Sequence, residues 1–193
     1  MTSSDPEALQ VAFQVLEILE RFGVPYHLGG AYASAIHGIP RQTHDVDLVV
    51  DLPAGLEKQI ATALEGEFYV DEKAIARAVG ERTSFNLVHL ATGVKVDLFV
   101  KGPSAFDESE FGRRVVVRIG DDPPREVFVK SAEDTVLRKA LWYQLGGEVS
   151  DRQLEDIRGI LAMQAGRLDV AYLTRWADQL AIQDLLDELL AKG

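Results

Sequence analysis

Two aspartates stand two residues apart in the segment 45–50, which reads DVDLVV. Alternate residues of a strand point to the same face, so Asp45 and Asp47 share one patch while the intervening apolar residues face the other way. Two carboxylates held side by side repel each other unless a cation lies between them, and hard oxygen ligands suit Mg²⁺ or Mn²⁺. We therefore expect a divalent metal at this pair, although two solvated acids at an exposed strand end would produce the same pattern.

A third aspartate, Asp97, lies in the segment 95–99, which reads KVDLF and is typical of a buried strand. If this strand pairs beside the segment 45–50, Asp97 becomes a third metal ligand. Three carboxylates of this kind hold two metal ions about 3.5–4 Å apart in phosphoryl transfer. The alternative is a salt bridge with Lys95, because residues i and i+2 of a strand lie on the same side.

A glycine pair, Gly29 and Gly30, follows a short apolar run and precedes a segment rich in small residues. This pattern predicts a strand, a tight turn and a helix. At such a turn the missing side chains allow backbone amides and the helix N-terminus to meet a phosphate. A bare glycine pair is more often only a tight turn, so the phosphate role depends on the neighbouring acids.

The elements that must position these residues follow from hydrophobic periodicity and turn signals. We expect helices at 6–22, 31–37 and 53–64, and strands at 24–28, 45–51, 84–90, 93–100, 114–119 and 125–130. The last two strands flank a turn at Asp121-Asp122-Pro123-Pro124, and residues 91–93 turn the hairpin before them. The segment 131–134, SAED, resembles a capping box, and helical spacing continues from there in about four helices. The predicted fold class is α/β (α+β): a mixed-sheet core at 1–130 with a helical region at 131–193 packed on it.

Length and composition limit the class of protein. The chain has 193 residues, 47% hydrophobic and 26% charged, as in a globular protein with one domain or one domain and a helical appendage. The absence of cysteine excludes disulfides and thiolate metal sites. The net charge of -11 disfavours a polynucleotide partner but is compatible with a nucleotide held through divalent cations. No apolar run approaches the roughly 18 residues needed to cross a bilayer, so a cytoplasmic protein without membrane contact is expected.

The three segments together resemble a known superfamily. LGG at 28–30, DVDL at 45–48 and VDL at 96–98 resemble the signature of the DNA polymerase beta-like nucleotidyltransferases: a Gly-Gly or Gly-Ser pair, an Asp-x-Asp strand and a later single carboxylate. More narrowly, GGAYA at 29–33 and HGIPRQTHD at 37–45 resemble the AbiEii-like group, found among bacterial toxin-antitoxin nucleotidyltransferases. Fourteen residues separate Gly30 from Asp45, slightly more than the usual family spacing. This difference in spacing affects one implication of the resemblance, namely which phosphate contacts Gly29 and Gly30 would make.

The helical end also resembles that group, in which a helix lysine and a downstream acid line the nucleotide cleft. The residues that carry this part of the resemblance are Asp134, Lys139, Trp142, Tyr143, Asp156 and Arg158. Without the resemblance, a lysine on an amphipathic helix is usually solvated, and the aromatic residues of the last third are most simply packing residues.

The resemblance implies a four- or five-stranded mixed sheet and transfer of a nucleotidyl group from ATP or another nucleoside triphosphate. In that case Asp45 and Asp47 ligate both metal ions, Mg²⁺ or Mn²⁺, while Asp97 ligates the catalytic metal and helps to deprotonate the attacking hydroxyl. Arg41 and Lys139 would steady phosphates, with Gly29 and Gly30 at the nucleotide. For Arg41 a pairing with a surface acid is an equally simple interpretation.

The acceptor is not implied by the resemblance and could be a tRNA, a protein or a small molecule. A homodimer and an antitoxin partner are both open. Two alternatives to an enzyme remain: a catalytically inactive nucleotide-binding module or toxin-antitoxin component with the same fold, and a protein that docks partners through its acidic surface.

Overall fold

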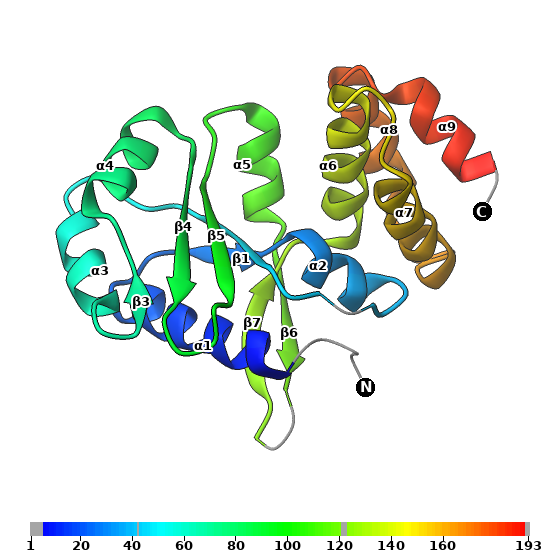
Figure 1. Cartoon of the computed structure of the whole chain (residues 1–193). Coiled ribbons are helices and arrows are strands. Elements are labelled where there is room, and N and C mark those ends of the chain that lie inside the picture. The colour runs from blue at the N-terminus through cyan, green and yellow to red at the C-terminus, as the bar shows by residue number, and fades with distance from the viewer. Residues whose placement is uncertain (1–5, 42, 121–122, 192–193) are drawn as a thin grey trace.

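A computed structural model describes residues 6–41, 43–120 and 123–191 of the chain. Figure 1 shows an α/β part, in which helices surround a sheet, and a group of helices at one side of it. The elements are α1 (Pro6–Arg21), β1 (Tyr26–Leu28), α2 (Gly30–His37), β2 (Val46–Val50), α3 (Glu57–Leu64), β3 (Phe68–Tyr69), α4 (Glu72–Glu81), β4 (Ser84–His89), β5 (Lys95–Val100), α5 (Ala105–Gly112), β6 (Val115–Ile119), β7 (Arg125–Val129), α6 (Ala132–Leu145), α7 (Asp151–Met163), α8 (Val170–Gln179) and α9 (Gln183–Ala191).

The strands form one mixed sheet in the order β3-β4-β5-β2-β1-β7-β6. The pairs β2 with β5 and β1 with β7 are parallel, and every other neighbouring pair is antiparallel. Because β1 runs opposite to β2, the end of β1 lies beside the beginning of β2, with Leu28 opposite Leu48. The chain after β1 therefore emerges next to the acidic start of β2.

One face of the sheet carries the main hydrophobic core. Val46, Leu48 and Val50 of β2 are fully buried, as the alternation of the sequence predicts. They belong to a cluster that also contains Leu16 of α1, Ile60 of α3 and side chains of α4. This packing leaves the alternate residues of β2 and β5 on the opposite face.

A second core holds the C-terminal helices together. Leu137 of α6, Ile157 of α7, Leu173 of α8 and Leu186 of α9 are fully buried in it, and Phe106 of α5 joins them. Each of these helices is short and buries its apolar face against its neighbours. Tyr172 and Trp176 pack here, as predicted for the aromatic residues of this region, whereas Trp142 is 56% exposed and does not.

The predicted fold class, a mixed sheet with helices on it and a helical C-terminal region, is confirmed. The sheet of the described residues has seven strands, so the four or five strands that the resemblance implied were too few. Six of the seven were expected from the pattern; β3 has only two residues, too few to show an alternation. The helices α4 and α5 were also missed, and the predicted turn at Asp121 and Asp122 lies outside the described residues. Within the described ranges, no helix is long and apolar enough to span a membrane.

Candidate functional site

Two of the three predicted acids lie directly beside each other. Asp47 of β2 is in register with Asp97 of β5, and the two strands are parallel neighbours, so both side chains stand on the same face of the sheet. Asp45 comes immediately before β2 and is exposed. The strand adjacency on which the metal-site prediction depended is therefore present.

The electrostatic state of Asp47 reflects this crowding. Burial raises the pKa of the Asp47 carboxyl, and the negative charges of Asp97 and then Asp45 raise it further. The ammonium of Lys139 and the backbone N–H of Ala31 act in the opposite direction. Asp47 thus lies where negative charge accumulates and where a helix lysine from the C-terminal region already compensates part of it.

The glycine pair forms the predicted turn between β1 and α2. The N–H of Gly29 donates to the backbone carbonyl of Asp47, at 2.9 Å. Gly30 has φ +50, and a Cβ built on it would lie 1.7 Å from Asp47 Oδ2. Gly30 is therefore required by the Asp47 carboxylate itself, which also accepts from Ala31 in the first turn of α2. A phosphate at this turn stays a prediction.

Arg41 and Lys139 share one acid. Arg41 makes a two-point contact with Asp156 of α7, with Nε to Oδ1 at 2.9 Å and Nη2 to Oδ2 at 3.1 Å. Lys139 Nζ lies 2.8 Å from Asp156 Oδ2 and donates to Gln153 Oε1 at 3.0 Å. The partner of Arg41 is a buried acid and not the surface acid considered from the sequence, and Lys139 is only 8% exposed and so is not a solvated lysine.

The pKa values of this triad follow from the contacts. Burial alone would raise the pKa of the Asp156 carboxyl, but the hydrogen bonds from Arg41 and Lys139 bring it below its ordinary value. The hydrogen bond to Asp156 is in turn the main reason that the pKa of Arg41 is raised, and Asp47 contributes at longer range. Both cations lie within electrostatic reach of Asp47.

Asp97 also has a partner on its own strand. Lys95 Nζ lies 2.8 Å from Asp97 Oδ2, which is the salt bridge held open as an alternative from the sequence. The Asp97 side chain is 21% exposed, so it is half-buried and not fully buried as expected. On the opposite flank, Asn86 of β4 pairs with Asp97 in register and is exposed.

The site can be tested for its fit to a metal. Among the residues that the structure describes, no group of three or more His, Cys, Asp or Glu side chains is arranged so that it could hold a metal ion. By donor chemistry, however, Asp45, Asp47 and Asp97 offer the hard oxygen ligands that Mg²⁺ and Mn²⁺ prefer. The raised pKa of Asp47 also indicates an excess of negative charge that a divalent cation would neutralise. The residues therefore fit the ion in type and charge.

A lysine that was not singled out from the sequence lies at the same edge. Lys130 directly follows β7 and is 5% exposed. Its Cε lies 3.8 Å and its Nζ 4.0 Å from the position of a Cβ on Gly29. The only sequence signal was a lysine between an apolar strand and the helix cap Ser131, which is too common a pattern to indicate a site.

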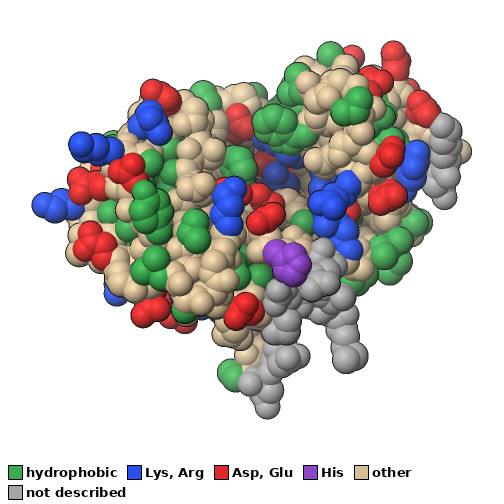
Figure 2. All heavy atoms as spheres, in the orientation of Figure 1, with side chains coloured by type: hydrophobic (Ala, Val, Ile, Leu, Met, Phe, Trp, Pro, Cys, Tyr) green, Lys and Arg blue, Asp and Glu red, His purple; other side chains and the backbone are tan. Residues whose placement is uncertain are grey.

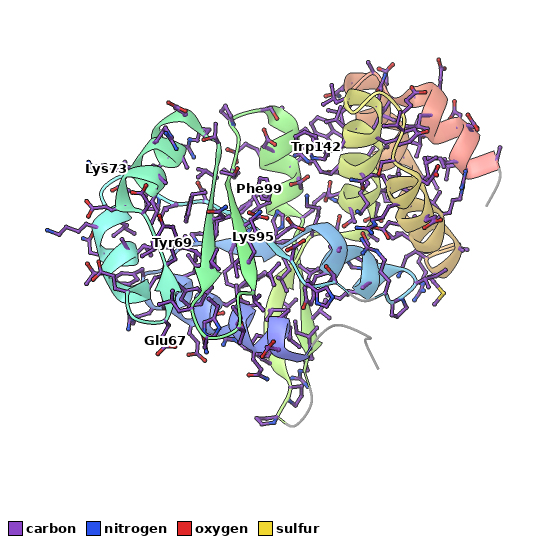
Figure 3. The ribbon with its side chains drawn as sticks, in the orientation of Figure 1. Glu67, Tyr69, Lys73, Lys95, Phe99 and Trp142 are labelled. Atoms are coloured by element: carbon purple, nitrogen blue, oxygen red, sulfur yellow. The ribbon has the colours of Figure 1, made fainter. Side chains whose placement is uncertain are left out.

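The surface between the sheet and the C-terminal helices is hollowed. Figure 2 shows a recess between the two parts, in which acidic and basic side chains lie together. Figure 3 places Lys95 and Phe99 along β5, and Trp142 on the side of α6 that faces α5. Phe99 is 39% and Trp142 56% exposed. Phe99 is two residues from Asp97 on the same strand, so the two side chains lie on the same face of the sheet.

Comparison with known proteins supports the fold. No family model and no curated protein matches the sequence. The solution structure of the antibiotic-resistance factor ANT(2'')-Ia aligns with a TM-score of 0.59 and 11% identity, over 95% of this chain and 98% of that one. A crystal structure of ANT(2'')-Ia in complex with adenylyl-2''-tobramycin gives 0.56 and 15%, over 87% and 98%. An antigenic nucleotidyltransferase-like protein from Paracoccidioides brasiliensis gives 0.53 and 18%, over 99% and 94%. At these identities the likeness shows that the chain has a nucleotidyltransferase fold.

Proposed function

We propose that this protein is a Mg²⁺- or Mn²⁺-dependent nucleotidyltransferase that transfers a nucleotidyl group from a nucleoside triphosphate, in the first place ATP, to an acceptor. The observation that carries the proposal is the register of Asp47 with Asp97 on neighbouring parallel strands, beside the Gly29-Gly30 turn. Two half-buried acids side by side on one face of a sheet repel each other, even with a lysine of a separate helix within electrostatic range, and this is an unfavourable arrangement for stability alone. It is the arrangement expected where phosphoryl transfer takes place.

In this proposal each residue has a separate task. Asp45, Asp47 and Asp97 would hold the divalent ions, which when bound neutralise charge on the triphosphate and on the leaving group. Arg41 and Lys139 bind phosphate oxygens, and Asp156 fixes the positions of both cations. Asp97 accepts the proton of the acceptor hydroxyl once Lys95 no longer neutralises it. The hydroxyl oxygen forms a bond to the α-phosphorus, the bond to the β-phosphate oxygen breaks, and pyrophosphate leaves.

The identity of the acceptor is the less specific part of the proposal. A structural neighbour has been crystallised with adenylyl-2''-tobramycin, an adenylylated small molecule. That complex supports a small-molecule acceptor here as the first choice to test, with a tRNA or a protein as further choices. Membership of the AbiEii-like group, and with it a toxin-antitoxin role, rests on the segments 29–33 and 37–45.

A second candidate function is a nucleotide-binding module without turnover. The ion pair between Lys95 and Asp97 favours it, because an acid that is neutralised by its neighbour is a poor proton acceptor. The carboxylates and cations would then bind a nucleotide, while Asp97 would not deprotonate an acceptor.

Both candidate functions require a nucleoside triphosphate to bind at the carboxylates, so the first experiment measures this binding. Wild-type protein, Asp47→Asn and Asp51→Asn are heated with and without Mg·ATP. Asp51 is the matched control because it lies just after β2 and pairs with Lys101. At a ligand concentration of 100 times Kd the native state gains about 2.7 kcal/mol, which is easily seen as a rise in Tm. The rise should persist in Asp51→Asn and be lost in Asp47→Asn; an equal rise in all three proteins would refute the proposed site.

Product formation separates the candidates. Each protein is incubated with α-labelled nucleoside triphosphates, Mg²⁺ or Mn²⁺, and an acceptor pool that contains tobramycin, total tRNA and protein. Labelled product that depends on Asp47 supports the transferase. Triphosphate binding without any labelled product supports the binding module.

A further inference from the structure

Lys130 is a buried cation at the edge of the candidate site, and the proposed reaction so far gives it no role. It follows β7, the strand on the other side of β1 from β2, and its N–H donates to the Leu28 carbonyl at 2.9 Å. Its Nζ lies 3.2 Å from Glu110 Oε1 of α5. Figure 1 shows β7 leading into α6. Lys130 directly precedes Ser131, the N-cap of α6, and its carbonyl oxygen lies 2.7 Å from His37 Nε2 of α2, so it contacts α2 as well as α5.

Gly29 separates Lys130 from Asp47. The Gly29 N–H donates to the Asp47 carbonyl, and a Cβ built on Gly29 would lie 3.8 Å from Lys130 Cε, 4.0 Å from Lys130 Nζ and 3.9 Å from the same carbonyl oxygen. Gly29 has φ -125 and ψ -149, extended backbone that any residue can adopt. Its backbone conformation therefore does not require glycine. What glycine provides is the close approach of the Lys130 side chain to the backbone of the turn that is predicted to bind phosphate.

The pairing of Lys130 with Glu110 is shared with a second cation. Arg138 Nε donates to Glu110 Oε2 at 2.8 Å, and Arg138 Nη2 donates to Asp107 at 2.8 Å. His27 Nε2 is 3.6 Å from Glu110 Oε1, just beyond hydrogen-bond length. If the Lys130 ammonium moved away, Glu110 would keep a charge-assisted partner in Arg138. Lys130 is thus the cation of this cluster that can be withdrawn without leaving a buried carboxylate uncompensated.

We infer that Lys130 is a further phosphate-binding residue, which reaches the triphosphate of the bound nucleotide past the backbone of Gly29. This inference rests on the proposed function. Lys130 exchanges Glu110 for a phosphate oxygen and so approaches the triphosphate from the β1–β7 side, while Arg41 and Lys139 approach it from the helical side. Three cations on two sides would balance the charge of a triphosphate that the carboxylates alone would repel.

Two substitutions distinguish phosphate binding from a purely structural role of the ion pair. Lys130→Met keeps most of the side-chain volume and removes the charge, and Glu110→Gln removes the other half of the same pair. Both should lower Tm, because both break the buried pair. Only Lys130→Met should weaken binding of Mg·ATP and Mg·tripolyphosphate in calorimetry, by about 10-fold or more, the value of one charge-assisted hydrogen bond. Glu110→Gln should bind at least as tightly as wild type.

A third variant avoids the risk that Lys130→Met fails to fold. In Gly29→Ala the new methyl group meets Lys130 and the Asp47 carbonyl at 3.8 to 4.0 Å, which is ordinary contact, so Tm should change little. The methyl group nevertheless lies against the Lys130 side chain, so it should hinder the approach of Lys130 to the phosphates and weaken triphosphate binding. In a double-mutant cycle the loss caused by Gly29→Ala should shrink in the Lys130→Met background.

The outcomes separate this inference from the proposed function. If wild type binds neither Mg·ATP nor Mg·tripolyphosphate, the proposed function fails and the inference fails with it. If wild type binds and Asp47→Asn does not, the function stands. Equal affinities of Lys130→Met and wild type, or equal losses in Lys130→Met and Glu110→Gln, would then overturn the inference alone, as would Gly29→Ala that binds like wild type.

Discussion

The carboxylate of Asp47 occupies the space that a side chain on Gly30 would need, with Oδ2 1.7 Å from the position of the missing Cβ. The same carboxylate accepts the N–H of Ala31, so it closes the first turn of α2 in the way that a capping acid does. The position of the Asp47 carboxylate in the candidate site therefore requires glycine at position 30.

Gly30→Ala should destabilise the protein and displace Asp47. The substitution places a methyl group against the carboxylate and forces a side chain into φ +50, which together should cost about 1–3 kcal/mol. Chemical denaturation measures the loss, and the metal-dependent rise in Tm with ATP should disappear as well. Gly29→Ala is the control for the loss of stability alone, because its backbone is extended and its nearest contact is 3.8 Å. A stable Gly30→Ala protein would show that Asp47 moves aside without cost.

Asp156→Asn should destabilise the protein by about 2 kcal/mol, since it leaves Lys139 in a buried position without its charged partner. Arg41 contributes less to this loss because its side chain is 30% exposed. Urea denaturation monitored by circular dichroism gives the free energy of unfolding. The matched variant Glu155→Gln, at an exposed neighbouring position of α7, should behave like wild type. A similar stability of both variants would contradict the tethering role of Asp156.

The pH dependence of stability should include a contribution from His37. Burial lowers the pKa of His37 below its ordinary value of 6.5, although the hydrogen bond from Nε2 to the Lys130 carbonyl opposes this. Between the folded pKa and 6.5 the unfolded chain binds more protons than the folded one, so stability is lost as pH falls through this window. One such group gives at most about 1.4 kcal/mol per pH unit.

The measurement is Tm from pH 7.5 to pH 5 in wild type and in His37→Gln, which retains a donor for the carbonyl. The variant should lose less stability on acidification. Some acid sensitivity should remain, because burial also lowers the pKa of His27. His44→Gln, at an exposed position, serves as the control and should keep the wild-type slope. An unchanged slope in His37→Gln would exclude His37 as a source of the acid sensitivity.

Tyr172→Phe should loosen the C-terminal helices. The Tyr172 hydroxyl donates to Asp134 Oδ1 at 2.6 Å and lies 3.0 Å from Ser109 Oγ. Asp134 is fully buried, so its carboxylate would lose a partner that water cannot easily replace. The expected cost is about 1–3 kcal/mol of unfolding free energy. Tyr143→Phe, on a half-buried position of α6, should cost much less; equal costs would contradict the importance of the Asp134 contact.

The sequence was sufficient for most of the fold and for the local part of the site. Alternation in 45–50 and 95–100 predicted two strands with acids on the same face, and their pairing brings Asp47 opposite Asp97. The C-terminal helices were visible through their spacing and through the cap at Ser131, whose hydroxyl accepts from Asp134 N at 3.1 Å. These features are local, or depend only on one strand finding its neighbour.

Contacts between distant segments could not be predicted in the same way. Arg41 and Asp156 are 115 residues apart, and only the packing of α7 against α2 brings them together. The same holds for Lys130 and Glu110, which meet because α5 lies against the end of β7. Lys95 and a metal ion compete for the Asp97 carboxylate. The sequence pattern around Asp97 is the same whichever of them neutralises it, so the pattern could not predict the partner. The catalytic and binding roles of these residues stay predictions.

The Arg41–Asp156–Lys139 contact lies between the sheet core and the core of the C-terminal helices. A triphosphate that draws both cations toward itself would weaken this internal tether and replace it with a bridge through the ligand. The two cores would then unfold as one cooperative unit when the nucleotide is bound and more independently when it has left. Arg41 and Lys139 would thus join the two cores in the free protein and bind the ligand that joins them in the complex.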